Sequence, residues 1–419
     1  MRSLIKYELK KMISRRVLQV SLGVVFAMIC YILFFNISSQ YALNPNKVGE
    51  EFEGTPAIAQ IKANADALAG PITDEKATKV LREYKTFIDL DEGEIKDEYR
   101  ADRADPGAEA AKYWRFNAAH GAYIALLTRP WMAGFQVPAT AAASIDTSQT
   151  VDLYGRIHTK IESQLEDTEG TFTYTAAEKE FWLNKADGVS KPVEYGYAEG
   201  WKDFFDLGQF LVLALIAVTI ACASVFNVEY REKTDAVLLS TKFGKTRLGK
   251  AKVIASIIAS SCIYWFMTLM LLIVPLVFFG ADGAGLLLQS MSLTNTYDLS
   301  YSAAAFIFCL IGYLAMLGLL GIILVCSARM RSSMGILAIG MAIVVAPALL
   351  PNLHNNFASH VLAVFPYLSL DPNNLFDMVS YSLGPVVIEY PVMLVILYGF
   401  LFVGGSLLAA RSFKKHQVA

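Results

Sequence analysis

The chain has 419 residues, of which 55% are hydrophobic and 18% are charged, and its mean hydropathy is +0.42. Charged residues make up about a quarter of an average soluble protein, so this composition excludes an ordinary soluble domain of the same length. The formal net charge is only −2, so the apolar excess is the feature to explain, and it predicts a membrane protein.

The first 16 residues form a basic amphipathic segment that precedes an apolar one. Apolar side chains recur at helical spacing along one face: Leu4, Ile5, Leu9, Met12 and Ile13. Lys6, Lys10 and Lys11 fall toward the other face. We therefore predict a cytoplasmic helix in the membrane interface, with these lysines among the lipid headgroups, before a transmembrane helix over residues 17–37.

Residues 38–205 form a polar block that is long enough for one domain. Apolar periodicity, an acidic start after Thr73 and a capping box at Thr175 and Glu178 predict that this domain is mostly helical. Residues 108–127 are one expected helix, and prolines 130 and 138 with the alanine run 139–143 are expected to end it. The domain has no metalloprotease or serine-hydrolase motif.

Aromatic side chains gather at the end of this block, directly before the next apolar segment: Tyr195, Tyr197, Trp201, Phe204 and Phe205. Amphipathic rings favour the headgroup layer, so we predict that Tyr195, Tyr197 and Trp201 belong to a belt at the membrane interface. A carbohydrate or peptide site is the alternative interpretation.

Five further apolar segments are candidate transmembrane helices: residues 207–228, 253–279, 303–328, 334–350 and 391–410. None of the six apolar segments contains Asp, Glu, Lys or Arg, which argues against transport driven by protons or ions. Pairs of small residues four apart predict close helix packing: Ala217/Ala221, Ala255/Ala259 and Ser256/Ser260, with Gly312, Gly318 and Gly321 in the fourth segment. All five cysteines lie in these segments and are interpreted as packing residues. The expected fold is an all-α membrane protein with six transmembrane helices and a mostly helical extracellular domain between helices 1 and 2.

The stretch 229–252 connects the second and third apolar segments and is strongly charged. Its Gly244-Lys245-Thr246 looks like the end of a phosphate-binding loop, but Leu239 stands where such a loop needs its first glycine. We therefore predict a short amphipathic helix and a basic turn here, and no nucleotide site.

Residues 351–390 contain apolar side chains at helical spacing from Phe357 to Phe365, followed by several prolines. We expect short helices on the outer side of the membrane, or a re-entrant segment. His354 and His360 lack a nearby carboxylate or cysteine in the sequence, so no metal site is predicted.

Lys and Arg concentrate in alternate short connections, which sets the expected orientation. They occur in residues 1–16, 229–252, 329–331 and 411–419, and are absent from residues 280–302 and 351–390. Both termini are therefore expected in the cytoplasm. Residues 38–205 are expected outside, because long domains cross the membrane largely regardless of their charge, here −10 from 18 basic and 28 acidic residues.

Together these features resemble the permease subunits of type-2 ATP-binding-cassette exporters. The most specific part lies after the second span, where the family has a pattern like F-x-x-E-x-x-x-x-T-x-x-x-L-L-S-T, then a basic turn and a lysine. In this chain the pattern reads Phe226, Glu229, Thr234, Leu238 to Thr241, Lys242 to Arg247, and Lys252. The turn "KFGK" departs from the family, in which many members have a proline. The large insertion resembles that of some Gram-positive bacterial members.

The resemblance implies that stretch 229–252 is a coupling helix that docks on a separate ATPase subunit. The residues it assigns to coupling are Glu229, Thr234, Val237, Leu238, Leu239, Lys242 and Arg247. It also implies two ATPase copies that use ATP and magnesium, while this chain binds no cofactor and is no enzyme. A second permease, identical or paralogous, would complete the pore in the bacterial plasma membrane. The cargo would be amphipathic: a peptide antibiotic, a lipid or a drug. No nucleic-acid partner is expected.

A membrane sensor or regulatory subunit is the alternative, with an extracellular domain that binds a peptide or a cell-wall ligand. An intramembrane enzyme is disfavoured because the spans lack polar catalytic residues. A structural anchor would not need the coupling stretch.

Overall fold

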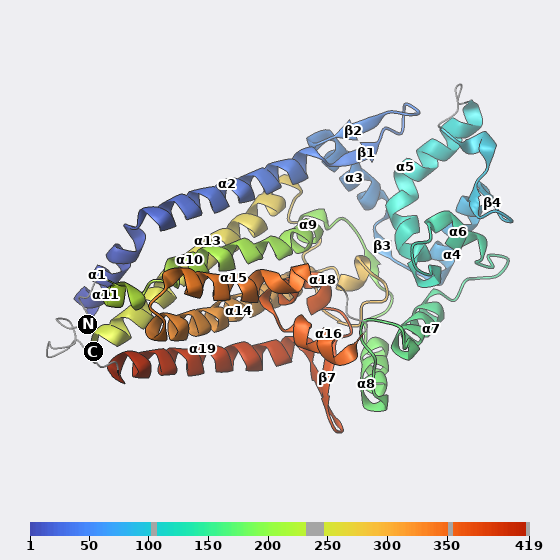
Figure 1. Cartoon of the computed structure of the whole chain (residues 1–419). Helices are drawn as coiled ribbons and strands as arrows, with labels where there is room; N and C mark the ends of the chain where they lie inside the picture. Colours follow the sequence, from blue (N-terminus) through green and yellow to red (C-terminus); the bar gives the residue numbers. More distant parts are fainter. Residues whose placement is uncertain (102–106, 232–246, 351–354, 416–419) are drawn as a thin grey trace.

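The computed structural model describes residues 1–101, 107–231, 247–350 and 355–415, and this part of the chain is mostly helical. Figure 1 shows a bundle of long helices with both chain termini at one end, called here the proximal end. The residues between helices α2 and α9 form a separate lobe at the opposite, distal end, called here the inserted domain.

Five helical segments are long and apolar enough to cross a membrane, so the chain is a multi-pass helical membrane protein. They are α2 (Arg16–Ser38), the segment Glu199–Glu229, α13 (Gly249–Phe278), α14 (Tyr301–Arg329) and most of α19 (Tyr390–Lys415). All five start before the predicted residue. The difference is largest at Glu199 rather than 207 and at Gly249 rather than 253, where polar residues continue the helices.

The sixth predicted span corresponds to α15 (Ser333–Leu349), which is apolar but shorter than the other five. Its 17 residues extend about 25 Å at 1.5 Å per residue, less than the roughly 30 Å of a hydrocarbon core. A crossing by α15 therefore stays a prediction. The helix packs closely on its neighbours, because a side chain at Gly340 would lie 2.7 Å from Ile323 Cδ1 of α14.

Helices α14 and α19 approach each other with their backbones nearly in contact. An added Cβ at Gly405 of α19 would lie 2.6 Å from the carbonyl carbon of Gly321, and one at Gly318 would lie 2.7 Å from Tyr398 Cδ1. Two of the three glycines predicted to permit close packing, Gly318 and Gly321, therefore do so against the last helix, whereas Gly312 packs against Tyr264 of α13. The other small pairs are buried as well, in α10 (Val212–Cys222) and α13, where Cys222 Sγ lies 3.4 Å from Ser260 Oγ.

Outside residues 102–106, the inserted domain contains six α-helices, two short 3-10 helices and three very short antiparallel strand pairs. The helices are α3 (Thr55–Leu68), α4 (Asp74–Lys85), α5 (Ala108–Thr128), α6 (Pro138–Ala143), α7 (Leu153–Glu166) and α8 (Ala176–Asp187). The strand pairs are β1 (Tyr41–Leu43) with β2 (Glu51–Glu53), β3 (Gly70–Pro71) with β6 (Glu194–Tyr195), and β4 (Ile88–Asp89) with β5 (Glu94–Ile95).

The caps predicted for two of these helices are present. Thr73 Oγ1 accepts a hydrogen bond from Lys76 N at the start of α4, and Thr175 and Glu178 form the reciprocal capping box of α8. The alanine run 139–143 was expected to end the helical pattern, but it forms α6. Pro138 occupies the first turn of α6, where its missing N–H has no intrahelical partner to lose.

Residues 355–390 contain three short helices, as expected, and a β-hairpin. The sequence analysis did not predict the hairpin. The helices are α16 (Asn356–Ala363), α17 (Pro366–Ser369) and α18 (Pro372–Leu375), and the hairpin pairs β7 (Ser380–Leu383) with β8 (Val386–Glu389). Gly384 in its turn has φ of 64°, a conformation that favours glycine. This hairpin corrects the all-helical prediction for this region.

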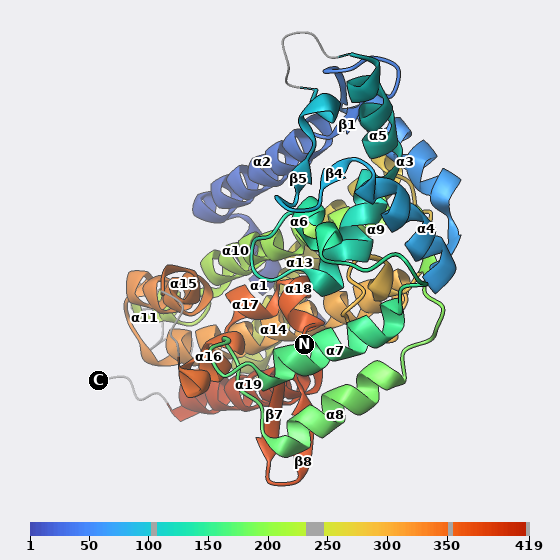
Figure 2. The ribbon, with the colours of Figure 1, turned by 90° about the vertical axis from the view of Figure 1, so that its right-hand side faces the viewer.

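The inserted domain packs against the distal end of the bundle through α8. In Figure 2, α8 lies beside the hairpin β7–β8. Ser380 Oγ donates to Glu178 Oε1 at 3.0 Å and accepts from Trp182 Nε1 at 3.2 Å, and all three side chains are buried. Lys185 forms an ion pair with Glu389 at 2.6 Å. These contacts fix the inserted domain relative to the last helix.

Candidate functional site

The proximal end of the bundle contains a cluster of buried charges, called here the proximal charge cluster: Glu8, Lys11, Glu229 and Lys252. Lys252 is 1% exposed, and its ammonium group donates to Glu229 Oε1 at 2.7 Å and to Glu8 Oε2 at 3.0 Å. Its third hydrogen bond goes to the carbonyl oxygen of Val225 at 2.8 Å. All three N–H donors of the lysine therefore have acceptors, as a buried ammonium requires.

Two of the cluster residues come from α1 (Arg2–Ile13), which packs against α13. Glu8 is 5% exposed and Lys11 is half-buried, and Lys11 Nζ lies 3.1 Å from Glu229 Oε1. The cluster contains two carboxylates and two ammonium groups, so its formal charges balance. A balanced, hydrogen-bonded set is the arrangement in which charges tolerate burial.

Glu229 reaches Lys252 because the second span is not one continuous helix. After α10, residues 223–226 form turns before α11 (Asn227–Arg231) begins. The backbone groups freed by this break have side-chain partners: Val225 O accepts from Lys252, and Phe226 N donates to Ser327 Oγ at 3.0 Å. The break therefore places the carboxylate of Glu229 beside the start of α13.

The proximal charge cluster joins three elements that are far apart in the sequence. Residues 8 and 252 are separated by 244 positions, and residues 229 and 252 by 23. Glu229 and Lys252 stand before and after the stretch 232–246, so their ion pair closes the base of that stretch. The ion pairs of the cluster therefore connect α1, α11 and α13.

Of the residues assigned to ATPase coupling, the structure describes the first and the last. Glu229 is buried in the proximal charge cluster, and Arg247 is exposed at the start of the segment that leads into α13. Thr234, Val237, Leu238, Leu239 and Lys242 lie outside the described residues, as does Gly244-Lys245-Thr246.

The predicted membrane-interface lysines divide into two kinds. Lys6 and Lys10 are exposed, as expected for headgroup contacts, whereas Lys11 is engaged with Glu229. The sequence analysis missed Glu8, which occupies the buried face of α1 with Met12, four residues away. The i, i+4 spacing of Glu8 and Met12 places both residues on one face of the helix, and this was the available signal. Burial of the Glu8 carboxylate also requires its partner Lys252, which the spacing does not reveal.

The aromatic residues predicted as an interface belt lie mostly inside the protein. Tyr195 is 7% exposed and packs edge-on against Tyr123 of α5, and Tyr197 is 3% exposed and donates to Phe279 O at 2.7 Å. Tyr195 therefore packs within the inserted domain and Tyr197 connects that domain to the bundle, so neither ring faces outward as predicted. Trp201 is half-buried, and its indole N–H donates to Ala281 O at 3.2 Å.

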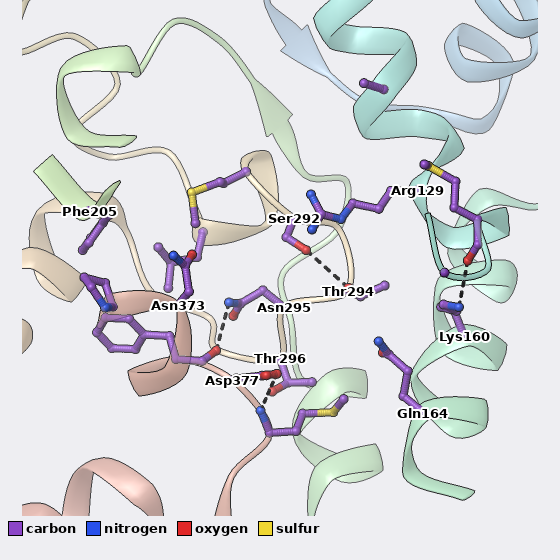
Figure 3. A pocket seen from close by; sticks show the side chains of 18 of the residues that line it. Arg129, Lys160, Gln164, Phe205, Ser292, Thr294, Asn295, Thr296, Asn373 and Asp377 are labelled. Atoms are coloured by element: carbon purple, nitrogen blue, oxygen red, sulfur yellow. Dashed lines mark hydrogen bonds between the residues drawn. The ribbon is translucent and has the colours of Figure 1, made fainter. Parts of the chain in front are cut away.

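A second candidate site is a cavity of about 700 Å³ at the distal end, called here the distal cavity. Figure 3 shows that its walls come from the inserted domain on one side and from two loops of the bundle on the other. The inserted domain contributes Arg129, Lys160 and Gln164, and the loops contribute residues 288–296 and 372–378. Cavities of roughly 300–1,000 Å³ are typical of ligand sites in proteins.

The histidine considered for a metal site has other partners. The two ring nitrogens of His360 lie 2.8 Å from Asn356 O and 3.0 Å from Ser380 O, so both face backbone carbonyl oxygens. His354 lies outside the described residues. Within the described ranges, no three His, Cys, Asp or Glu side chains are grouped so that they could hold a metal ion.

Comparison with known proteins gave no match to a family model, to a curated protein or to a solved structure.

Proposed function

We propose that the chain is the permease subunit of a type-2 ATP-binding-cassette exporter, which exports an amphipathic substrate with energy from ATP hydrolysed by a separate subunit. The observation that carries this proposal is the ion pair of Glu229 and Lys252 at the base of stretch 232–246. A stretch that receives mechanical work from a partner needs a stiff attachment to the membrane helices. The buried ion pair supplies one, because all three N–H donors of Lys252 have acceptors.

The proposed coupling follows from the connections of the proximal charge cluster. When the partner ATPases close on ATP and magnesium, they displace the leucine-containing stretch. The load passes through Glu229 to Lys252 at the start of α13 and to Glu8 of α1. The helices then move as rigid bodies between two arrangements of the pore, which is a common form of two-state transition.

The proposal includes the assembly and its orientation. Two ATPase copies bind at the proximal end, and a second permease, identical or paralogous, completes the pore in a bacterial plasma membrane. Both termini lie in the cytoplasm, and residues 38–205 lie outside. The basic residues of the proximal end support this orientation, since Lys and Arg concentrate on the cytoplasmic side.

The test is the double variant Leu238→Asp with Leu239→Asp, expressed in the native host with an affinity tag. We expect the variant to insert into the membrane but to lose a co-purifying chain that hydrolyses ATP, together with resistance to amphipathic peptides. Leu383→Asp is the matched control, because it makes the same chemical change at a residue that is 68% exposed at the distal end. Unchanged ATP hydrolysis and resistance in the double variant would refute the proposal.

The second candidate function is a membrane sensor or regulatory subunit. The distal cavity favours it, because a ligand bound between the inserted domain and the bundle loops contacts both parts at once. A sensor would respond to its ligand without moving it across the membrane. Measuring efflux of a labelled ligand from inverted vesicles with ATP separates the two functions, since only the exporter accumulates the label.

A further inference from the structure

We propose that the distal cavity is a binding site for a short amphipathic peptide with a free carboxylate and a free ammonium group. The proposal does not depend on whether the chain exports this peptide or only senses it. It rests on the side chains that line the cavity, on their unused hydrogen-bonding groups, and on the way charges of opposite sign are divided between its two walls.

The wall from the inserted domain carries positive charge. Arg129 follows the last turn of α5, and Figure 3 shows its side chain extending toward the loop at Ser292. Among the described residues, the guanidinium group of Arg129 has neither a hydrogen bond nor an ion pair. Lys160 of α7 donates one hydrogen bond, to Met132 O at 2.9 Å, and pairs with no carboxylate in the described chain. This wall can therefore bind an anionic group.

The opposite wall carries the cavity's negative charge. Asp377 has an exposed side chain and lines the cavity. One carboxylate oxygen accepts a hydrogen bond from Met378 N at 2.8 Å. No ion pair joins this carboxylate to a described cation, and the surrounding protein raises its pKa by desolvation. An ammonium group of the ligand would supply the opposite charge.

Between the charged walls lie groups that suit a peptide backbone. The side chains of Gln164 and Asn373 line the cavity, and no hydrogen bond joins them to other described residues. Thr296 is 1% exposed, and its hydroxyl group likewise has no partner in the described part of the chain. Among the described residues, the side-chain amides of Gln164 and Asn373 are therefore available to bond to a peptide backbone.

Apolar side chains complete the lining and account for the amphipathic character of the proposed ligand. Leu288, Met291 and Phe376 line the bundle side of the cavity. Asn295 Nδ2 donates to Phe376 O at 3.1 Å, which fixes the loop that carries Phe376. A peptide with aliphatic side chains can therefore place its ends on Arg129 and Asp377 and its side chains on this surface.

The experiment measures binding of a tetrapeptide of leucine and alanine to the purified full-length chain in an uncharged detergent. The peptide is prepared with both ends free, with an amidated carboxyl end, and with an acetylated amino end. We expect the free peptide to bind about 10- to 100-fold more tightly than either blocked form, as for the loss of one hydrogen bond to a charged group.

Two variants test which residue binds the carboxyl end of the peptide and which binds its amino end. Arg129→Gln should bind the free and the amidated peptide equally, and Asp377→Asn should bind the free and the acetylated peptide equally. Each variant should retain discrimination at the other end, which shows that the cavity is still folded. Lys79→Gln removes a charge from an exposed position of α4 outside the cavity and should behave like the wild type.

Three outcomes would overturn the proposal. The first is an absence of saturable binding by the wild-type chain. The second is retention of both end preferences in both variants. The third is displacement of the peptide by phosphatidylethanolamine at equal concentration, which would assign the cavity to a zwitterionic lipid instead.

Discussion

The ammonium group of Lys252 lies 2.7 Å from Glu229 Oε1, although the two residues belong to different helices on either side of stretch 232–246. Both side chains are almost completely buried. The helices that precede and follow this stretch are therefore joined by one ion pair, and Glu8 of the first helix pairs with the same lysine.

Replacement of Lys252 by methionine should be strongly destabilising, because it leaves the carboxylates of Glu8 and Glu229 buried without their main partner. We expect a loss of about 3–5 kcal/mol in the free energy of unfolding, typical of a broken buried ion pair. The measurement is thermal or denaturant unfolding of the purified protein in detergent. Lys6→Met is the matched control, since Lys6 is exposed on the same helix as Glu8.

The triple variant Lys252→Met, Glu8→Gln, Glu229→Gln tests why Lys252→Met is destabilised. It distinguishes the effect of unpaired buried charges from a general disruption of packing. It removes the unpaired carboxylates as well as the lysine, so it should be more stable than Lys252→Met alone. A single variant as stable as the Lys6→Met control, or a triple variant less stable than the single one, would contradict a charge-balanced cluster.

Adjacent glycines in α19 provide a second test, because only one of them faces α14. A methyl group at Gly405 would lie 2.6 Å from the backbone of Gly321, whereas one at Gly404 would meet nothing within 4 Å. We expect Gly405→Ala to lower stability by about 1–3 kcal/mol through overpacking. Gly404→Ala should be neutral or slightly stabilising, because alanine favours the helix. Equal unfolding temperatures for the two variants would count against the close α14–α19 contact.

Local signals in the sequence predicted much of the helical architecture. These signals are local, because each involves residues close together in the sequence and can be identified from composition and spacing. They are the apolar segments, the caps at Thr73 and Thr175, and the glycines of α14. The hairpin β7–β8 was missed because only short helices or a re-entrant segment were expected in residues 351–390, and the prolines there, including Pro385 of the turn, were not assigned to a hairpin.

The candidate sites were harder to predict because their residues meet only in three dimensions. Glu8 was assigned no role, since a single carboxylate on a basic helix indicates nothing without its partner Lys252. The distal cavity needs α5, α7 and two loops of the bundle, and no motif connects Arg129 with Asp377 in the sequence. Contacts between residues this far apart in the sequence cannot be predicted from the periodicity of apolar residues.

The ionisation of Asp377 should make stability depend on pH. Burial raises the pKa of this carboxyl group in the folded protein, so the folded state holds the proton more tightly than the unfolded state. The stabilising contribution is complete below the ordinary value of 3.8 and is lost as the pH rises through the folded pKa. Asp377→Asn keeps the acceptor for Met378 N but cannot ionise.

We therefore expect the unfolding temperature of Asp377→Asn to exceed that of the wild type increasingly as the pH rises from about 4, the ordinary pKa of aspartate, to neutrality. Calorimetry in a non-ionic detergent over this range measures the difference. Asp91→Asn, at an exposed position of the inserted domain, is the control and should follow the wild type. Parallel pH curves for Asp377→Asn and the wild type would contradict a raised pKa of this carboxyl group in the folded protein.

The orientation of the chain can be tested with two single cysteines in a background without the five native ones. Phe135→Cys lies on a fully exposed position of the inserted domain, and Ser240→Cys lies within the stretch closed by Glu229 and Lys252. If the basic residues set the orientation, a membrane-impermeant maleimide should label residue 135 in intact bacterial cells. It should label residue 240 only after the membrane is permeabilised. The reverse pattern would place the stretch on the outer surface, where no cytoplasmic ATPase could reach it, and the proposed coupling through Glu229 and Lys252 would fail.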